Sequence, residues 1–231
     1  MPIKAAGERF KRLQEQCREP GLTALLLLEV ALIFGAIPLA GMGVSPLATL
    51  PVMFALLVIA TLVVTSRSNF AVAVVLISVV LSQGGIFIRL EHPSVATDWL
   101  SAGGRLLLIL ALSWVIAGAV FGPGRVTLHR VQGAIVLYLN CGLFFFTIYR
   151  LIVVLDPGAF EGLSQAPNES GSGAGLLYFS FSTLTTAGFG DIAPLNPMAR
   201  NMANLESIIG QLYPATLLAR LVSLELVDRR G

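Results

Sequence analysis

The chain has 231 residues, of which 55% are hydrophobic and only 12% are charged, and its net charge at pH 7 is +2. Soluble globular proteins carry roughly 25% charged residues. This composition, with a mean hydropathy of +0.82, excludes a soluble domain and predicts an integral membrane protein whose main environment is the lipid bilayer. We expect no nucleic-acid partner and no small-molecule substrate.

The first twenty residues are polar and basic, and apolar residues recur among them at helical spacing: Ile3, Ala6, Phe10, Leu13 and Cys17. Residues 1–20 are therefore expected to form a cytoplasmic N-terminal segment. Two interpretations stay open, an amphipathic helix on the inner membrane surface and a solvated leader. A cleaved signal peptide is not expected, because both the polar stretch and the apolar run after it are too long.

Six apolar segments follow, at about 21–41, 46–65, 70–89, 99–121, 130–153 and 198–225. Each can cross a hydrocarbon core of about 30 Å, which takes roughly 20 helical residues. Lipid cannot satisfy open backbone groups, so these crossings must be helical. The sequence thus predicts an all-α, multi-pass membrane protein with six transmembrane helices. A long exposed loop over residues 156–174 separates the fifth segment from the sixth.

Charged residues between the segments predict the orientation. With the N-terminus inside, eleven lysines and arginines fall on the inner side, and four fall on the outer side: Arg89, Arg105, Arg150 and Arg200. This excess follows the positive-inside rule. Both termini are therefore expected in the cytoplasm. The low lysine content and the lack of an organelle signal favour the inner membrane of a bacterium.

Cysteine and histidine do not form a recognisable site. Cys17 lies in the basic leader and Cys141 in an apolar segment, so no disulfide is expected. His92 and His129 are far apart in sequence, and a zinc site needs several clustered ligands. We expect no cofactor and no enzymatic activity. The sequence also contains no intramembrane catalytic pair and no internal repeat of the kind found in secondary transporters.

A short amphiphilic run precedes the last apolar segment. Residues 175–184 mix leucine and aromatic side chains with serine and threonine. At about a dozen residues, this run is too short to cross a bilayer. It predicts a re-entrant helix that enters from outside, and its C-terminal end carries about half a negative charge. Such an end stabilises a cation.

The run leads into residues 185–191, Thr-Thr-Ala-Gly-Phe-Gly-Asp, which we name the TTAGFGD segment. Glycine adopts backbone angles that other residues avoid. Alternation of such angles can turn successive carbonyl groups to one side of the chain. A row of carbonyl oxygens on one side can bind a cation that has lost its water.

The TTAGFGD segment resembles the selectivity filter of potassium channels. The resemblance implies that backbone carbonyls replace the hydration shell of K⁺, with ligands from Thr186, Ala187, Gly188 and Phe189. Gly190 would complete the outer mouth, and Asp191 would hold the outer end through a hydrogen bond. The chain has one copy of the motif, so a closed ring requires a homotetramer. The implied function is passive K⁺ conduction, with permeant K⁺ as the bound ion.

The resemblance is strong over residues 174–225 and only architectural over residues 21–153. Arg200 stands where simple bacterial potassium channels open their pore-lining helix with an arginine, and Gly210 stands at the spacing of their hinge glycine. Pro214 follows one turn later and would break the local hydrogen-bond ladder. Either residue could bend the helix at a gate. Gly210 could equally permit close helix packing.

Six crossings with a pore loop before the last resemble the voltage-gated cation channels, in which the fourth helix carries regularly spaced arginines. Here residues 99–121 contain only Arg105, near the outer end. One charge moved through the membrane potential yields about 2.3 kcal/mol per 100 mV, so steep gating needs several charges. We expect weak or absent voltage gating, with Arg105 as an interface anchor. The chain then divides into a sensor-like or scaffold domain, residues 21–125, and a pore domain, residues 126–231.

Two positions depart from the family pattern: Ala187 stands where valine is usual and Phe189 where tyrosine is usual. The alternative function is therefore a less selective monovalent cation channel of the same shape. Ser182 and Thr185 are expected to support the filter from behind.

Two acids, Glu29 and Glu206, lie inside predicted helices, where an ionisable group is costly and marks a functional site. Glu206 is expected either to brace the filter through Ser182 or Thr185, in its own or a neighbouring subunit, or to concentrate cations in a water-filled cavity. Glu29 could pair with a basic residue near the inner face or with none.

Overall fold

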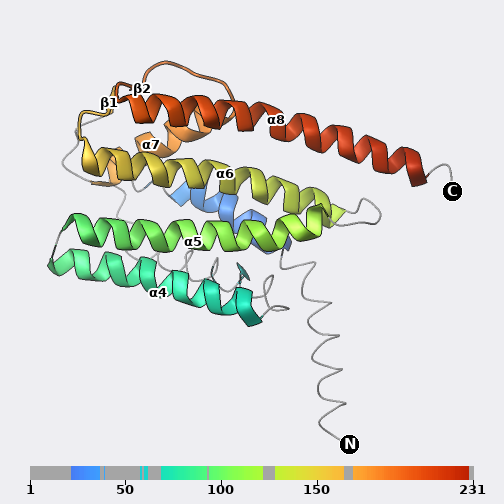
Figure 1. The fold of residues 1–231 in the computed structure, drawn as a ribbon, viewed down its shortest axis with the longest axis horizontal. Helices are drawn as coiled ribbons and strands as arrows, with labels where there is room; N and C mark the ends of the chain where they lie inside the picture. The colour runs from blue at the N-terminus through green and yellow to red at the C-terminus, as the bar shows by residue number, and fades with distance from the viewer. Residues whose placement is uncertain are drawn as a thin grey trace, which may run out of the picture.

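The computed structural model describes residues 22–36, 39, 58, 60–61, 69–92, 94–121, 128–163 and 169–228. The predictions for residues 1–20, for most of the segment 46–65 and for the domain boundary between residues 125 and 126 lie outside these ranges. The described chain is mostly helical, as predicted, and its long helices lie side by side in a bundle (Figure 1).

An α-helix over residues 22–31 continues into one π-helical turn, η1 (Leu32–Ala36). The remaining elements follow in the order α4 (Asn69–Glu91), α5 (Val95–Val120), α6 (Leu128–Leu155), β1 (Phe160–Glu161), α7 (Glu169–Leu184), β2 (Ala193–Pro194) and α8 (Pro197–Asp228). The predicted segments 70–89, 130–153 and 198–225 thus correspond to α4, α6 and α8, each extended by a few residues.

Three helices of the described chain are long and apolar enough to cross a membrane: Phe70–Arg89, Val95–Gly118 and Leu128–Leu155. Leu22–Gly35 is a shorter apolar helix. Helix α8 has 32 residues but is not among the three. It carries more polar side chains, among them Arg200, Asn201, Asn204, Glu206, Gln211 and Arg220. Six crossings therefore remain a prediction.

Helices α4 and α5 form a hairpin whose backbones approach closely. A Cβ at Gly85 would lie 2.7 Å from the backbone nitrogen of Ser101, and one at Gly104 would overlap the backbone of Ser82. Glycine at these two positions lets the helices pack at this distance, as small residues do between membrane helices.

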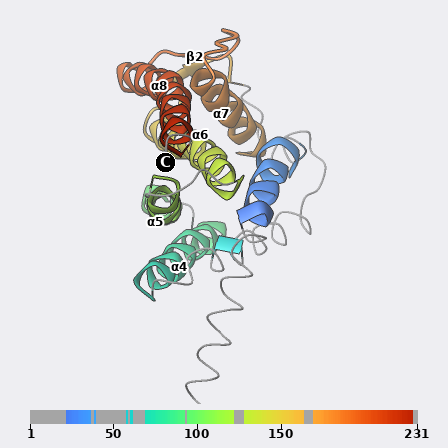
Figure 2. The same cartoon turned by 90° about the vertical axis from the view of Figure 1, so that its right-hand side faces the viewer.

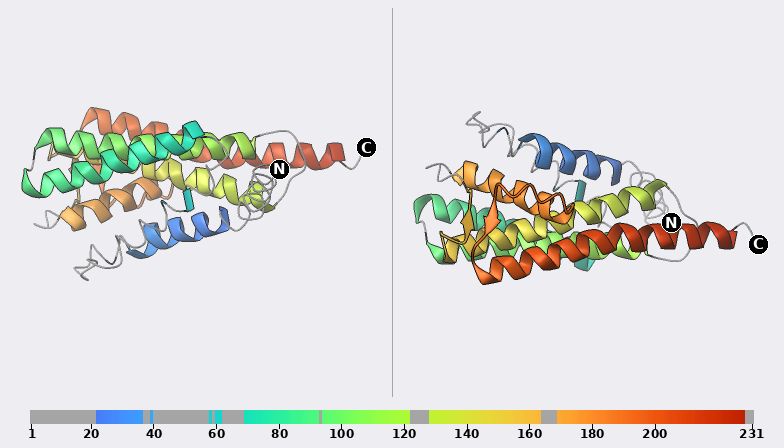
Figure 3. Two further views of the ribbon diagram at one scale, coloured as in Figure 1. Left: turned by 90° about the horizontal axis from the view of Figure 1, so that it is seen from below. Right: turned by 90° about the horizontal axis from the view of Figure 1, so that it is seen from above.

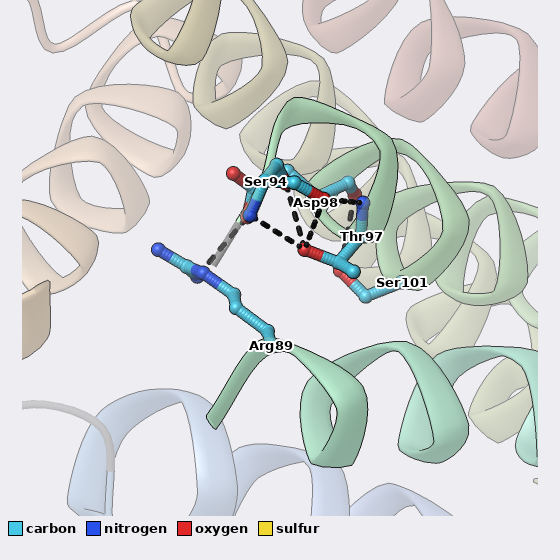
Figure 4. A network of polar contacts seen from close by, with 5 residues as sticks. All are labelled: Arg89, Ser94, Thr97, Asp98 and Ser101. Atoms are coloured by element: carbon cyan, nitrogen blue, oxygen red, sulfur yellow. Dashed lines mark hydrogen bonds and ion pairs between the residues drawn. The ribbon is translucent and has the colours of Figure 1, made fainter. Parts of the chain in front are cut away.

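The start of α5 corrects the predicted fourth segment, which was expected to begin at about residue 99. The helix begins at Val95 because Ser94 and Thr97 form a reciprocal capping box (Figure 4). Asp98 therefore lies in the first helical turn, where a negative charge is favourable. Its carboxylate is 3.1 Å from the guanidinium of Arg89 at the end of α4.

Helix α6 lies between the α4–α5 hairpin on one side and helices α7 and α8 on the other (Figure 2). One face packs with α5 and residues 22–31 around a buried cluster that includes Leu25, Ile116 and Val136. The other packs with α7 and α8 around Phe145, Tyr149 and other apolar residues. The C-terminal part of α8 extends past the other helices (Figure 3).

The region between α6 and α8 is more ordered than the predicted loop. Helix α7 begins at Glu169, although residues 156–174 were expected to be an exposed loop. Serine and glycine dominate its first turns, and their low helix propensity hid the helix from the sequence pattern. Strands β1 and β2, also unpredicted, pair antiparallel with Phe160 opposite Pro194. They join the chain before α7 to the chain after the TTAGFGD segment.

Candidate functional site

Helix α7 presents the TTAGFGD segment at its C-terminal end. Its apolar residues Leu176, Phe179 and Leu184 are buried, mainly against α6 and α8. The ring of Phe179 packs edge-to-face on Tyr149 of α6 and on Phe160 of β1, with centroid distances of 5.1 Å and 5.2 Å. Aromatic rings in such contacts fix the orientation of a helix beyond what burial alone requires.

The backbone of the TTAGFGD segment alternates between negative and positive φ angles from one residue to the next. Thr186, Gly188 and Gly190 have positive φ angles of 59°, 53° and 80°, while Ala187 and Phe189 between them do not. Gly162 is the only other residue with positive φ among those described. Threonine rarely adopts this conformation, and a non-glycine residue there indicates a functional constraint. This alternation is the backbone form expected to turn successive carbonyls to one side.

The last carbonyls of α7 anchor the first half of the segment. The amides of Ala187 and Gly188 donate to the Ser182 carbonyl over 2.9 Å and 3.3 Å, and the amide of Thr186 donates to the Thr183 carbonyl. The Thr185 hydroxyl donates to the Phe181 carbonyl over 2.7 Å. Ser182 therefore contacts the segment through its backbone.

The outer half of the segment rests on Tyr178 of α7. The Tyr178 hydroxyl donates to the Asp191 carboxylate over 3.1 Å, and the Tyr178 ring stacks on Phe189 with an interplanar angle of 14°. Asp191 thus accepts a hydrogen bond within the chain, and the sequence did not suggest Tyr178 as its donor. All residues from 185 to 191 are exposed in the single chain.

Glu206 joins three helices in the interior. Its carboxyl oxygens lie 2.6 Å from the Tyr149 hydroxyl of α6 and 2.6 Å from the Ser180 hydroxyl of α7. Ser180 is also 2.8 Å from the carbonyl of Gly142 in α6. All three side chains are fully buried. The predicted contact with α7 is present within one chain, but its partner is Ser180 rather than Ser182 or Thr185.

Gly210 lies against the end of α7. A Cβ at this position would overlap the Leu184 carbonyl, which is backbone and cannot rotate away. Of the two roles considered for Gly210, close packing is present in the structure, and the hinge stays a prediction. Helix α8 continues through the exposed Pro214.

Arg200 fixes the start of α8. Its Nε donates to the Pro194 carbonyl over 2.9 Å. The Asn196 side chain donates to the Asp156 carboxylate over 2.8 Å, which joins the start of α8 to the end of α6. These bonds hold the chain that leaves the TTAGFGD segment.

Four polar residues were missed in the sequence: Tyr138, Tyr149, Tyr178 and Ser180. Each hydroxyl has a partner in another element or in the TTAGFGD segment. Single hydroxyls are common in membrane helices, so only the identity of the partner distinguishes these.

Glu29 is buried, and its Oε2 has no hydrogen-bond partner within the described residues. Within the same ranges, no group of three or more histidine, cysteine or acidic side chains could hold a metal ion.

Residues 133–225 match the model of a protein family described as "Ion channel". This match supports an ion channel. The matched range includes most of α6 together with α7, the TTAGFGD segment and most of α8, which are the elements joined by the contacts above. No curated protein and no solved structure is significantly similar to the chain.

Proposed function

We propose that the chain is one subunit of a homotetrameric channel that conducts K⁺ passively across a membrane. The alternating backbone of the TTAGFGD segment carries this proposal, because positive φ at Thr186, Gly188 and Gly190 suits a single-file row of carbonyl ligands. The ligands would be the carbonyls of Thr186, Ala187, Gly188 and Phe189. Gly190 would form the outer mouth.

The surfaces that the single chain leaves open support an assembly of several subunits, and the number four comes from the resemblance to potassium channels. No atom lies within 4 Å of a Cβ added at Gly188 or Gly190, and Phe189 is 71% exposed. Helix α8 exposes apolar residues, among them Leu205, Ile208 and Leu212. Subunits that share a central axis would cover these residues and bring four TTAGFGD segments around one ion path. The more polar composition of α8 suits a helix that lines a water-filled pore.

The position of α7 suits a cation. Its C-terminal end, with the negative end of the helix dipole, adjoins the start of the TTAGFGD segment. In a tetramer, four such ends would face the pore and stabilise an ion below the filter. Helix α7 would then be the re-entrant pore helix between α6 and α8, and both chain termini would lie in the cytoplasm.

Strong voltage gating is not part of the proposal. Helix α5 carries one basic side chain, that of Arg105, which is half-buried. Steeply voltage-dependent opening takes on the order of tens of kcal/mol, which a single charge per subunit cannot supply.

Flux in liposomes tests the proposal. Purified protein should carry K⁺ much faster than Na⁺, and a quaternary ammonium ion should block the flux. Gly188→Ala should abolish it, because alanine is strained at φ 53°. Gly103→Ala, in open space on α5, is the control and should conduct as the natural chain does. Equal K⁺ and Na⁺ flux would leave the less selective cation channel, and no flux in a folded tetramer would refute conduction.

A further inference from the structure

We propose that Glu206 carries a proton at neutral pH and that its neutral carboxyl group positions α7 against α6 and α8. Glu206 is thus a positioning residue that acts on the TTAGFGD segment through α7. The proposal predicts that alkaline pH weakens the ion path, and in that respect it rests on the channel function proposed above.

A count of hydrogens is the first argument. Three close contacts join four groups: Tyr149 to Glu206 at 2.6 Å, Ser180 to Glu206 at 2.6 Å and Ser180 to the Gly142 carbonyl at 2.8 Å. Each contact needs one hydrogen, but the two hydroxyls supply only two. An ionised Glu206 is an acceptor only and adds none. A protonated Glu206 supplies the third by donating to Ser180, which then donates to Gly142.

The surroundings of Glu206 give the second argument. From α6, the titratable groups that act on Glu206 are Tyr149, Cys141 and Tyr138, all neutral at pH 7. From α7, only the hydroxyl of Ser180 contacts it. No cationic side chain is among these neighbours in the described chain. A fully buried carboxylate without a cation is costly, and protonation removes that cost.

The path to the ion is short. Ser180 lies two residues before Ser182 in α7. The Ser182 carbonyl accepts hydrogen bonds from the amides of Ala187 and Gly188. When the proton leaves, Ser180 has one hydrogen for two acceptors, and a negative charge stands between three helices. Either the bond from Ser180 to Gly142 or the bond from Ser180 to Glu206 is lost. The end of α7 is then free to move, and the TTAGFGD segment moves with it.

Glutamine is the decisive substitution, because its amide imitates the protonated acid. In Glu206→Gln the amide oxygen can accept from Tyr149 while the amide nitrogen donates to Ser180. This variant should keep its structure and lose its response to pH. Glu161→Gln makes the same chemical change at an exposed carboxylate on β1 and serves as the matched control.

The experiment measures K⁺ flux from liposomes over a series of alkaline pH values, equal on both sides. We expect the K⁺ flux of the natural chain and of Glu161→Gln to fall at least about tenfold as the proton leaves, a change that corresponds to about 1.4 kcal/mol. Glu206→Gln should keep the neutral-pH flux throughout. A Glu206→Gln channel that responds to pH as the natural chain does, or a folded tetramer of it that conducts nothing at neutral pH, overturns the proposal.

Infrared spectroscopy tests the proton without ion flux. The difference spectrum between the natural chain and Glu206→Gln should show the carbonyl stretch of a protonated carboxylic acid at neutral pH. Ser180→Ala should shift that band, because it removes the acceptor of the proton, and this reading holds even if Glu206→Gln does not fold. Absence of the band refutes the proton on Glu206, and a band that Ser180→Ala leaves in place refutes its donation to Ser180. A protein that shows the band and conducts no ion refutes the proposed function alone.

Discussion

The α6–α7–α8 region and the α4–α5 hairpin are held together in different ways. In the first region, side-chain hydroxyls cross between helices and bond to backbone carbonyls or to Glu206. Examples are the bonds from Tyr138 to Leu184, from Tyr213 to Ala134 and from Ser207 to Thr183. In the hairpin, the two helix backbones pack closely at Gly85 and Gly104, and an ion pair between Arg89 and Asp98 lies at the turn.

The difference matters because hydrogen bonds restrict geometry more tightly than close helix packing does. Geometric preferences of hydrogen bonds restrict both distance and angle, so several of them fix a helix in rotation as well as in position. Close packing across glycine fixes the distance between two helices, but one helix can slide along the other at a lower energetic cost than in the hydrogen-bonded region. The region that presents the TTAGFGD segment is thus the more tightly specified one. Substitutions in each region should separate loss of conduction from loss of stability.

Gly210→Ala should have the largest effect. The new Cβ would overlap the Leu184 carbonyl, and this carbonyl cannot move without the TTAGFGD segment, which begins at the next residue. The cost should reach or exceed the upper end of the about 1–3 kcal/mol that overpacking typically adds. We expect loss of the tetramer in gel filtration and loss of K⁺ flux. A stable, conducting Gly210→Ala tetramer would mean that α7 and α8 are less constrained than the structure indicates.

Gly104→Ala should destabilise the hairpin and spare the ion path. The new Cβ would overlap the backbone of Ser82, but among the described elements α4 makes its main contacts with α5 and can move away from it. We expect a loss of about 1–3 kcal/mol in the free energy of unfolding, with an unchanged ratio of K⁺ to Na⁺ flux. Thermal unfolding and liposome flux measure the two effects separately.

Gly103→Ala is the control for both glycine substitutions, because its Cβ would meet no atom within 4 Å. Alanine in a helix interior is more favourable than glycine by up to about 1 kcal/mol, so this variant should be equal or slightly more stable. A change in ion selectivity in Gly104→Ala would contradict the separation of the two regions.

The same contrast explains what could be predicted from the sequence. The helices α4, α6 and α8 were found because long apolar runs follow from the thickness of a bilayer. The TTAGFGD segment was found because two glycines around an aromatic residue are unusual between apolar segments. Both signals lie in local sequence, and neither needs knowledge of a partner.

The contacts that hold the site depend on partners far apart in the chain. The bracing hypothesis placed Glu206 against α7 through Ser182 or Thr185. The actual partner is Ser180, and only the rotation of α7 about its axis decides which of its hydroxyls faces Glu206. Tyr149 lies 57 positions from Glu206, and no local pattern connects the two. The first turns of α7 were not predicted because glycine and serine, which dominate them, have low helix propensity.

Among the destabilising substitutions, Tyr138→Phe should have the smallest effect. It is also the most informative of them. The Tyr138 hydroxyl donates to the Leu184 carbonyl over 3.2 Å, and this carbonyl belongs to the last residue of α7, where helical carbonyls lack intrahelical donors. Tyr213→Phe is a matched control from the same stacked pair of rings. Its hydroxyl bonds to Ala134, whose position inside α6 gives that carbonyl a helical donor as well. Loss of Tyr138 should therefore cost about 1 kcal/mol, loss of Tyr213 should cost less, and only the first should change K⁺ flux. Equal effects in thermal unfolding and flux would show that the end of α7 is held by packing, as the hairpin is, rather than by directed hydrogen bonds.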